Sequence, residues 1–213
     1  MRRVGLMMLA LVVSFPAMAI AAEPKPGQSY EELLAKLQAG DTAIDYQALR
    51  FAYAETPDFH PDAAPAASKS DLIQAVRSGN LGDALGLANT ILAVNYTDMD
   101  AHLASFLVYA SRGDQAKAEF HRAVLRGLMK SLTDTGDGMS EDSAIIVVSV
   151  AEEYSYLGLK GYQIMREGMA PSSSGPLAVV AVTTSDNQGA TVYFNIRRLV
   201  AKMSPTTDAL PKP

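Results

Sequence analysis

The fold is decided by residues 79–92, GNLGDALGLANTIL, which recur in altered form at residues 113–126, GDQAKAEFHRAVLR. Ala84 and Ala118 occupy equivalent positions in the two copies. Glycine suits a tight turn between antiparallel helices, and alanine lets two helices approach closely. Because the offset from Gly79 to Gly113 equals the tetratricopeptide period, we predict tetratricopeptide-like packing. The alternative is an ordinary pair of helical hairpins with glycine turns.

Helical patterns extend from this repeat toward the N-terminus. Ser29 and Glu32 form a capping box before an apolar stripe of helical spacing, and a second short helix fits residues 45–54. Residues 57–68 contain three prolines and are expected to form a surface loop. We therefore expect residues 29–130 to be helical.

The pattern changes to β-structure toward the C-terminus. β-branched runs at residues 145–150, 177–183 and 191–196 predict strands, and residues 186–189 form the turn between the last two. Residues 162–169 suit a further strand, whereas residues 152–159 suit a strand or a helix. The predicted fold class is α+β, with N-terminal tetratricopeptide-like helical hairpins followed by a small antiparallel β-sheet. The single domain spans residues 29–200, and its β-rich part spans 144–198.

Residues 1–21 have the pattern of a signal peptide. Arg2 and Arg3 precede the apolar run at residues 4–13, and small residues follow it, so cleavage after Ala19, Ala21 or Ala22 is expected. The run is too short to span a bilayer, and nothing after residue 22 is long and apolar enough to do so. Residues 22–28 are expected to be a flexible lead-in and residues 201–213 a disordered tail. The chain has no cysteine, which favours the bacterial periplasm or secretion without disulfides.

Charge and composition exclude several functions. The formal net charge is −5, so the chain lacks the basic field that attracts nucleic acid. Without cysteine there is no thiolate nucleophile or thiolate metal site. No phosphate-binding loop or dinucleotide fingerprint is present, and we predict no cofactor. A peptide or protein partner is expected instead, while the oligomeric state stays open.

A set of short motifs spread along the chain resembles one protein family. The motifs are Gly40-Asp41, Asp45-Tyr46, Leu49-Arg50, Asn95-Tyr96, Asp98, Ala101-His102, Phe120-His121-Arg122, Thr135-Gly136-Asp137-Gly138, Glu152-Glu153-Tyr154 and Tyr193-Phe194-Asn195. Together they are similar to a family of secreted bacterial proteins classed as a domain of unknown function. The resemblance covers about residues 28–200. It implies secretion and brings no established activity, substrate or cofactor.

The polar residues that could form a binding site cluster in the second half of the helical region and just beyond it. They are Asp98, His102, His121, Arg122, Asp137, Glu152 and Glu153. Asp98 and His102 lie one helical turn apart on one face, so we predict that they pair. We predict that His121 faces residues 134–138 or Glu152. Two histidines with carboxylates can bind a metal or transfer protons, although no HExxH motif is present.

Two functions from different classes follow. The first is a non-catalytic periplasmic module that binds a peptide or protein through its helical hairpins. The second is a small periplasmic hydrolase or metal-dependent enzyme with a site at His102, His121 and Glu152. Convergence of Asp98, His102, His121 and Glu152 on an open cleft would favour the enzyme, and their separation would disfavour it.

Overall fold

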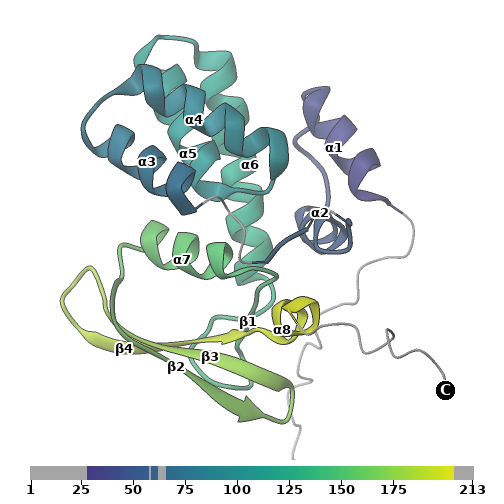
Figure 1. The fold of residues 1–213 in the computed structure, drawn as a ribbon, viewed down its shortest axis with the longest axis vertical. Coiled ribbons are helices and arrows are strands. Elements are labelled where there is room, and N and C mark those ends of the chain that lie inside the picture. Colours follow the sequence, from purple (N-terminus) through teal and green to yellow (C-terminus); the bar gives the residue numbers. More distant parts are fainter. Residues whose placement is uncertain (1–27, 58, 62–65, 204–213) are drawn as a thin grey trace, which may run out of the picture.

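Helices occupy the N-terminal part of the chain and strands follow them. The computed structural model describes residues 28–57, 59–61 and 66–203. Its elements are α1 (Tyr30–Gln38), α2 (Tyr46–Tyr53), α3 (Ala66–Arg77), α4 (Leu81–Val94), α5 (Met99–Ser111), α6 (Gln115–Thr133), β1 (Ile145–Ile146), α7 (Val150–Leu159), β2 (Gln163–Ser172), β3 (Gly175–Thr183), β4 (Gly189–Asn195) and α8 (Arg197–Met203). This order confirms the α+β prediction. In Figure 1 the sheet lies below helices α1–α6, and α7 lies between the two parts.

Side-chain caps fix where the helices begin. Ser29 and Glu32 form the predicted capping box of α1, with both reciprocal hydrogen bonds present. The carboxylates of Asp45, Asp98 and Asp114 accept hydrogen bonds from backbone amides in the first turns of α2, α5 and α6. These caps satisfy amides that the helix itself leaves unpaired. The N-terminal half is therefore specified largely by local sequence.

Two glycine turns join the helices in pairs. Gly79 follows α3 with a φ of 71° and Gly113 follows α5 with a φ of 74°, values that favour glycine. Ala84 on α4 and Ala118 on α6 are 0% and 1% exposed, as close helix packing requires. The two predicted hairpins, α3–α4 and α5–α6, are thus present. Their likeness to tetratricopeptide repeats stays a prediction.

The sheet is mixed, which corrects the prediction of an antiparallel sheet. Its strand order is β1-β4-β3-β2, with antiparallel pairing between β2, β3 and β4. β1 pairs with β4 in parallel, Ile145 opposite Phe194. The predicted strand at residues 145–150 shrinks to Ile145–Ile146 because Ser149 caps the next helix and turns the backbone. The predicted strand at residues 162–169 is confirmed as β2.

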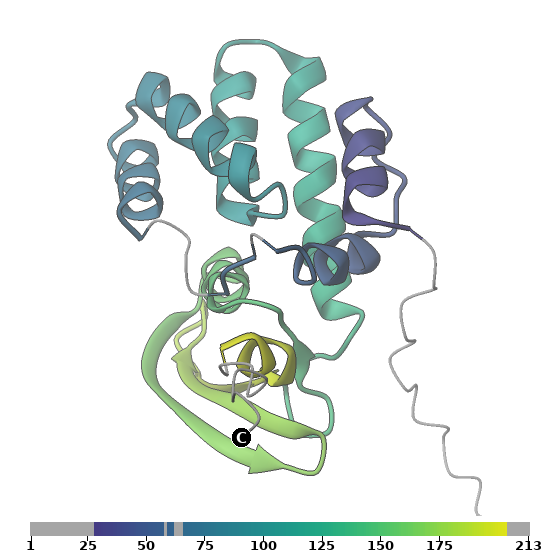
Figure 2. The same cartoon turned by 45° about the vertical axis from the view of Figure 1, so that its right-hand side comes forward.

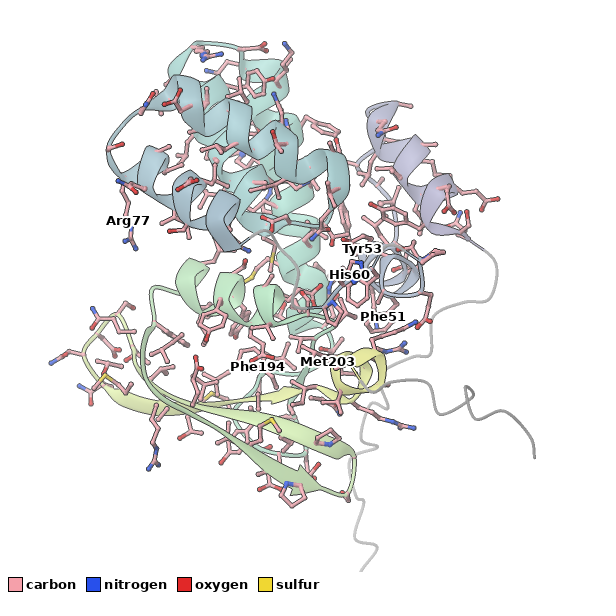
Figure 3. All side chains as sticks on the ribbon, viewed as in Figure 1. Phe51, Tyr53, His60, Arg77, Phe194 and Met203 are labelled. Carbon is pink, nitrogen blue, oxygen red and sulfur yellow. The ribbon has the colours of Figure 1, made fainter. Side chains whose placement is uncertain are left out.

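Helix α7 settles the region that the sequence left undecided. The Ser149 side chain accepts a hydrogen bond from the backbone amide of Glu152, which starts a helix at residue 150. Tyr156 of α7 meets Phe194 of β4 edge to face, with ring centroids 5.8 Å apart. Figure 3 shows Phe194 directed from the sheet toward α7. The main apolar core lies between α6, α7 and this face of the sheet.

Three helix ends differ from the predicted boundaries. Helix α3 begins at Ala66, inside the stretch expected to be a surface loop. Helix α6 continues to Thr133, beyond the expected end of the helical part at residue 130. Helix α8 runs to Met203, so residues 201–203 are helical rather than part of a disordered tail.

Both ends of the chain lie outside the described residues. This applies to the predicted signal peptide, to almost all of the predicted lead-in and to residues 204–213. Within the described residues, no helix combines the length and apolar character needed to cross a membrane.

Candidate functional site

His102 and His121 meet between α5 and α6. Their Nδ1 atoms are 2.9 Å apart, and Nε2 of His102 lies 3.0 Å from the carbonyl oxygen of Tyr96. A carbonyl only accepts, so we assign the His102 proton to Nε2, which leaves its Nδ1 to accept a hydrogen bond from His121. Burial lowers the pKa of His102 to about 3 and that of His121 to about 4. This neutral pair connects two helices.

The geometry corrects both predicted histidine pairings. His102 does not pair with Asp98, because that carboxylate caps Ala101 at 2.9 Å and lies 3.2 Å from Nζ of Lys69. His121 faces His102 rather than Glu152 or residues 134–138. The i, i+4 spacing of Asp98 and His102 was misleading because a cap side chain turns back toward its own first turn.

Lys69 of α3 links three helices. Its ammonium group lies 3.2 Å from Asp98 and 2.8 Å from Asp100 of α5, and it donates to the Ser155 hydroxyl of α7 at 3.3 Å. Ser155 in turn donates to Asp100 at 2.8 Å. Burial disfavours the charge on Lys69, but the two carboxylates outweigh it and raise its pKa. Lys69 therefore stays charged and acts as a structural link.

Glu152 is held by Arg50, which is 1% exposed. Nε and Nη2 of Arg50 donate to the two carboxylate oxygens of Glu152, each at 2.7 Å, and the Val148 amide donates to the same carboxylate at 2.9 Å. Arg50 also donates to the carbonyl oxygens of Ser131 at 3.2 Å and Ile146 at 2.9 Å. This bidentate pair joins α2, α6, β1 and α7 and leaves Glu152 unavailable for catalysis.

Glu153, the next residue, has the opposite environment. It is 9% exposed, and no described residue forms a hydrogen bond or an ion pair with its carboxylate. Burial, together with the charges of Glu167 on β2 and Glu152, raises the pKa of Glu153 to about 8. Sequence reasoning singled out Glu153 but contained no signal of this isolation, since Glu167 belongs to a strand that comes later in the chain.

Arg122 and Asp137 lie elsewhere. Arg122 is exposed on α6 and donates to Glu119 of the same helix, with Nε 3.0 Å from the carboxylate. Asp137 organises its loop by accepting from the Met139 amide at 2.9 Å and the Ser143 hydroxyl at 2.6 Å, and these bonds lower its pKa. Among the described residues, no three His, Asp or Glu side chains are grouped to hold a metal. The predicted site residues thus lie in separate places rather than at one cleft.

A groove lies between α3, α5 and α7, with a volume of about 700 Å³. Lys69 and Asp100 lie in its wall, already paired with each other, and Arg77 lies at the C-terminal end of α3. Figure 3 shows Arg77 directed away from the helices. The rest of the lining is mainly apolar: Pro61, Leu72, Ile73, Val76, Leu103, Ala104, Val150, Ala151, Tyr154 and Leu159. Sequence reasoning missed this groove, because its walls come from segments that are distant in the chain.

These features define an α+β protein whose conspicuous cavity is an apolar groove and whose histidines and Glu152 are engaged in structural contacts. The chain belongs to the family described as Domain of unknown function (DUF4919), whose model matches residues 24–204. The resemblance to a domain of unknown function is thereby confirmed. No curated protein and no solved structure matched the chain.

Proposed function

We propose that this protein is a non-catalytic binding module, and that the groove between α3, α5 and α7 takes an apolar segment of a peptide or protein partner. The observation that carries the proposal is the groove itself, about 700 Å³ in volume and walled by apolar side chains from three helices. Binding sites are typically concave and apolar with few polar groups. The charge of Lys69 in the wall is paired with the carboxylates of Asp98 and Asp100, so this ammonium group does not face an apolar occupant unpaired.

The groove lies where the helical hairpins meet the α7 side of the sheet. Helix α3 forms one wall through Leu72, Ile73 and Val76, and α7 forms another through Val150 and Leu159. Figure 2 shows α3 and α4 at the outer end of the helical part, with α7 below them. The sequence-based proposal of binding by the hairpins is therefore refined, since α7 also contributes a wall of the groove.

The proposal includes location. The N-terminal pattern of residues 1–21 and the absence of cysteine support export to the bacterial periplasm or beyond. N-terminal sequencing of the protein from an envelope fraction should give a start between Ile20 and Glu23. A chain that retains Met1 in that fraction would refute cleavage.

Dye binding tests the groove directly. The probe is 1-anilinonaphthalene-8-sulfonate, whose fluorescence rises on apolar surfaces. We expect the wild-type protein to enhance the fluorescence, and Ile73→Asp, in the groove, to reduce the enhancement at least threefold. The matched control is Val94→Asp, which changes an apolar side chain that is 64% exposed outside the groove. Equal enhancement by both variants would contradict the proposal.

A photo-crosslinking amino acid gives the second test. Placed at residue 73 it should yield crosslinked products with envelope proteins, and the same group at residue 94 should not. The crosslinked products should disappear when Leu103→Asp is added, because Leu103 of α5 also lines the groove. Crosslinks that persist in that variant would show that the contact lies outside the groove.

A further inference from the structure

Strand β2 forms a free edge of the sheet. The strand order ends at β2, and no described segment pairs with its outer side. Residues 163–169 of this strand are all exposed. An edge strand offers unpaired backbone donors and acceptors at every second residue, which is the arrangement that accepts an added strand.

Exposed apolar side chains gather on and beside this edge. Met165 and Met169 are 67% and 74% exposed, and Ile164 and Tyr154 are also exposed. These make four of the nine large apolar side chains exposed in the described part of the chain, and three of the four belong to one strand. Methionine is flexible and adapts to varied apolar partners. This concentration distinguishes β2 from the rest of the surface.

One face of this edge carries negative charge, whereas Arg166, which pairs in register with Ala181, projects from the opposite face. Glu167 pairs in register with Val180 and Met169 with Ala178, so both project from the face of the sheet that carries the buried Val180. The Tyr154 hydroxyl donates to Glu167 at 3.0 Å. Glu153 lies nearby on α7, nine-tenths buried and without a hydrogen-bonding or ionic partner among the described residues. Glu153 and Glu167 are close enough for their charges to interact.

We propose that β2 accepts an extended segment of a partner protein as an added strand, with a lysine or arginine facing Glu167 and Glu153 and apolar side chains two positions away on each side. Side chains two apart share a face of a strand. The apolar ones therefore face Met169 on one side and, on the other, Ile164 and Met165, where the register of β2 shifts. The backbone supplies affinity and the basic side chain supplies specificity. Glu153 is mainly protonated near neutral pH in the free protein, because its pKa is raised to about 8, and a cation at this point favours its carboxylate form.

A second copy of this chain fits the edge less well. Two β2 strands related by a two-fold axis pair antiparallel, and the register that sets Met165 against Met169 also sets the two Glu167 carboxylates against each other. Like charges directly opposite destabilise a strand pair. The proposed surface shares only Tyr154 with the α3–α5–α7 groove, so this inference is independent of the proposed function.

Peptide binding tests the proposal. The probe is the synthetic nonapeptide acetyl-STVTKTVTS-amide, and the control replaces its central lysine with glutamate. NMR titration of the purified protein should show saturable shifts at the amides of β2, with at least tenfold weaker binding of the glutamate peptide. Glu167→Lys should reverse this preference, whereas Glu141→Lys, an equal charge change on an exposed loop, should keep it. The absence of lysine-peptide binding, or an unchanged preference in Glu167→Lys, would overturn the proposal.

Two further variants distinguish binding at the edge from binding in the groove. Replacing both Met165 and Met169 with serine should weaken lysine-peptide binding at least fivefold with an unchanged melting temperature, because both side chains are exposed. Ile73→Asp should leave peptide binding intact. If Ile73→Asp abolishes binding, the peptide occupies the groove and the inference about β2 is wrong.

Light scattering checks that the protein does not self-associate through β2. A dimer that Glu167→Lys dissociates would also overturn the proposal.

Discussion

The helical part and the α7–sheet part of this molecule differ in how their buried ionisable groups are paired. In the helical part, the buried ionisable side chains Asp98 and His102 are bonded to neighbours within the helices, although the hydroxyl of Ser105 on α5 has no hydrogen-bond partner in the described part of the chain. On α7, Glu153 is 9% exposed and no described residue is bonded to its carboxylate, and the ten-residue strand β2 is open along one edge. Buried polar groups that lack a partner cost stability, so such a group is a better indication of a ligand site than a group whose hydrogen bonds are satisfied. The difference teaches that the sheet part and its junction with the helices are the places to look for ligands.

The largest expected effect tests what joins the two parts. Replacing Arg50 with alanine leaves Glu152 buried without its counter-charge and should lower the free energy of unfolding by about 3–5 kcal/mol. Urea unfolding monitored by circular dichroism measures this change. Arg122→Ala, which removes an exposed arginine paired only within its own helix, should change it by less than about 0.5 kcal/mol. Similar losses in the two variants would contradict the assignment of Arg50 as the connection.

The next effect tests the close packing of the helical part. Ala84 and Ala118 are buried at helix contacts, so Ala84→Leu or Ala118→Leu should overpack them and destabilise the protein by roughly 1–3 kcal/mol. Thermal melting measures both. The matched control is Ala116→Leu, at an exposed position on α6, which should leave the melting temperature nearly unchanged. Unchanged melting in both core variants would refute the packing.

The histidine pair makes the helical part sensitive to acid. The pKa values of His102 and His121 in the folded protein, about 3 and about 4, lie below the usual value of 6.5. The unfolded chain therefore binds protons first, so stability is complete above pH 6.5 and falls as the pH drops toward 4. His121→Ala should cost roughly 1–3 kcal/mol at pH 7, because it leaves a buried acceptor on His102 without a donor.

The measurement for this variant is urea unfolding across pH 4–8. The slope of stability against pH should be smaller in His121→Ala than in the wild-type protein, since one of the two suppressed protonations is gone. If His121→Ala changes neither the free energy of unfolding nor its slope against pH, the histidine pair does not contribute to stability.

The smallest expected effect is a gain in stability when Glu153, which lies on α7 beside the sheet, is replaced. The pKa of Glu153 is raised to about 8 from 4.5, so the folded protein holds a proton that the unfolded chain releases. Stability is therefore complete below pH 4.5 and falls as the pH rises through 8. Glu153→Gln removes this penalty and should stabilise the protein by about 1 kcal/mol or more at pH 9, with little change at pH 4. Thermal melts at the two pH values test this, and a loss of stability at pH 9 would contradict the isolation of Glu153.

The elements that sequence predicted well are those with local causes. The capping box at Ser29 and the turn at Gly113 each involve residues within a few positions of one another, so the sequence displays them directly. To predict helix α7, the cap at Ser149 has to be weighed against the β-branched run before it. To predict β1, its parallel pairing with β4 at the far end of the β-rich part has to be known. Strand propensity alone does not reveal such pairing.

The candidate sites depend on distant contacts, and they were mostly missed. Sequence reasoning singled out His102 and His121 but assigned them the wrong partners, because the Asp98 cap bonds Lys69, 29 residues away. It identified Glu152 as a polar candidate without finding Arg50, and nothing near Glu153 in the sequence shows that it is buried and alone. The groove and the open edge of β2 are properties of packed surfaces, which no single segment encodes.

The Arg50–Glu152 contact also sets the order in which this protein can fold. The two residues are 102 positions apart in the chain, so the contact closes a long loop and forms only after much of the chain has been made. Until residue 152 is available, α2 must either leave its guanidinium in water or bury it without a counter-charge. The N-terminal helices should therefore not be stable as a fragment ending at residue 133. The whole chain should unfold in one cooperative transition, although its architecture has two parts.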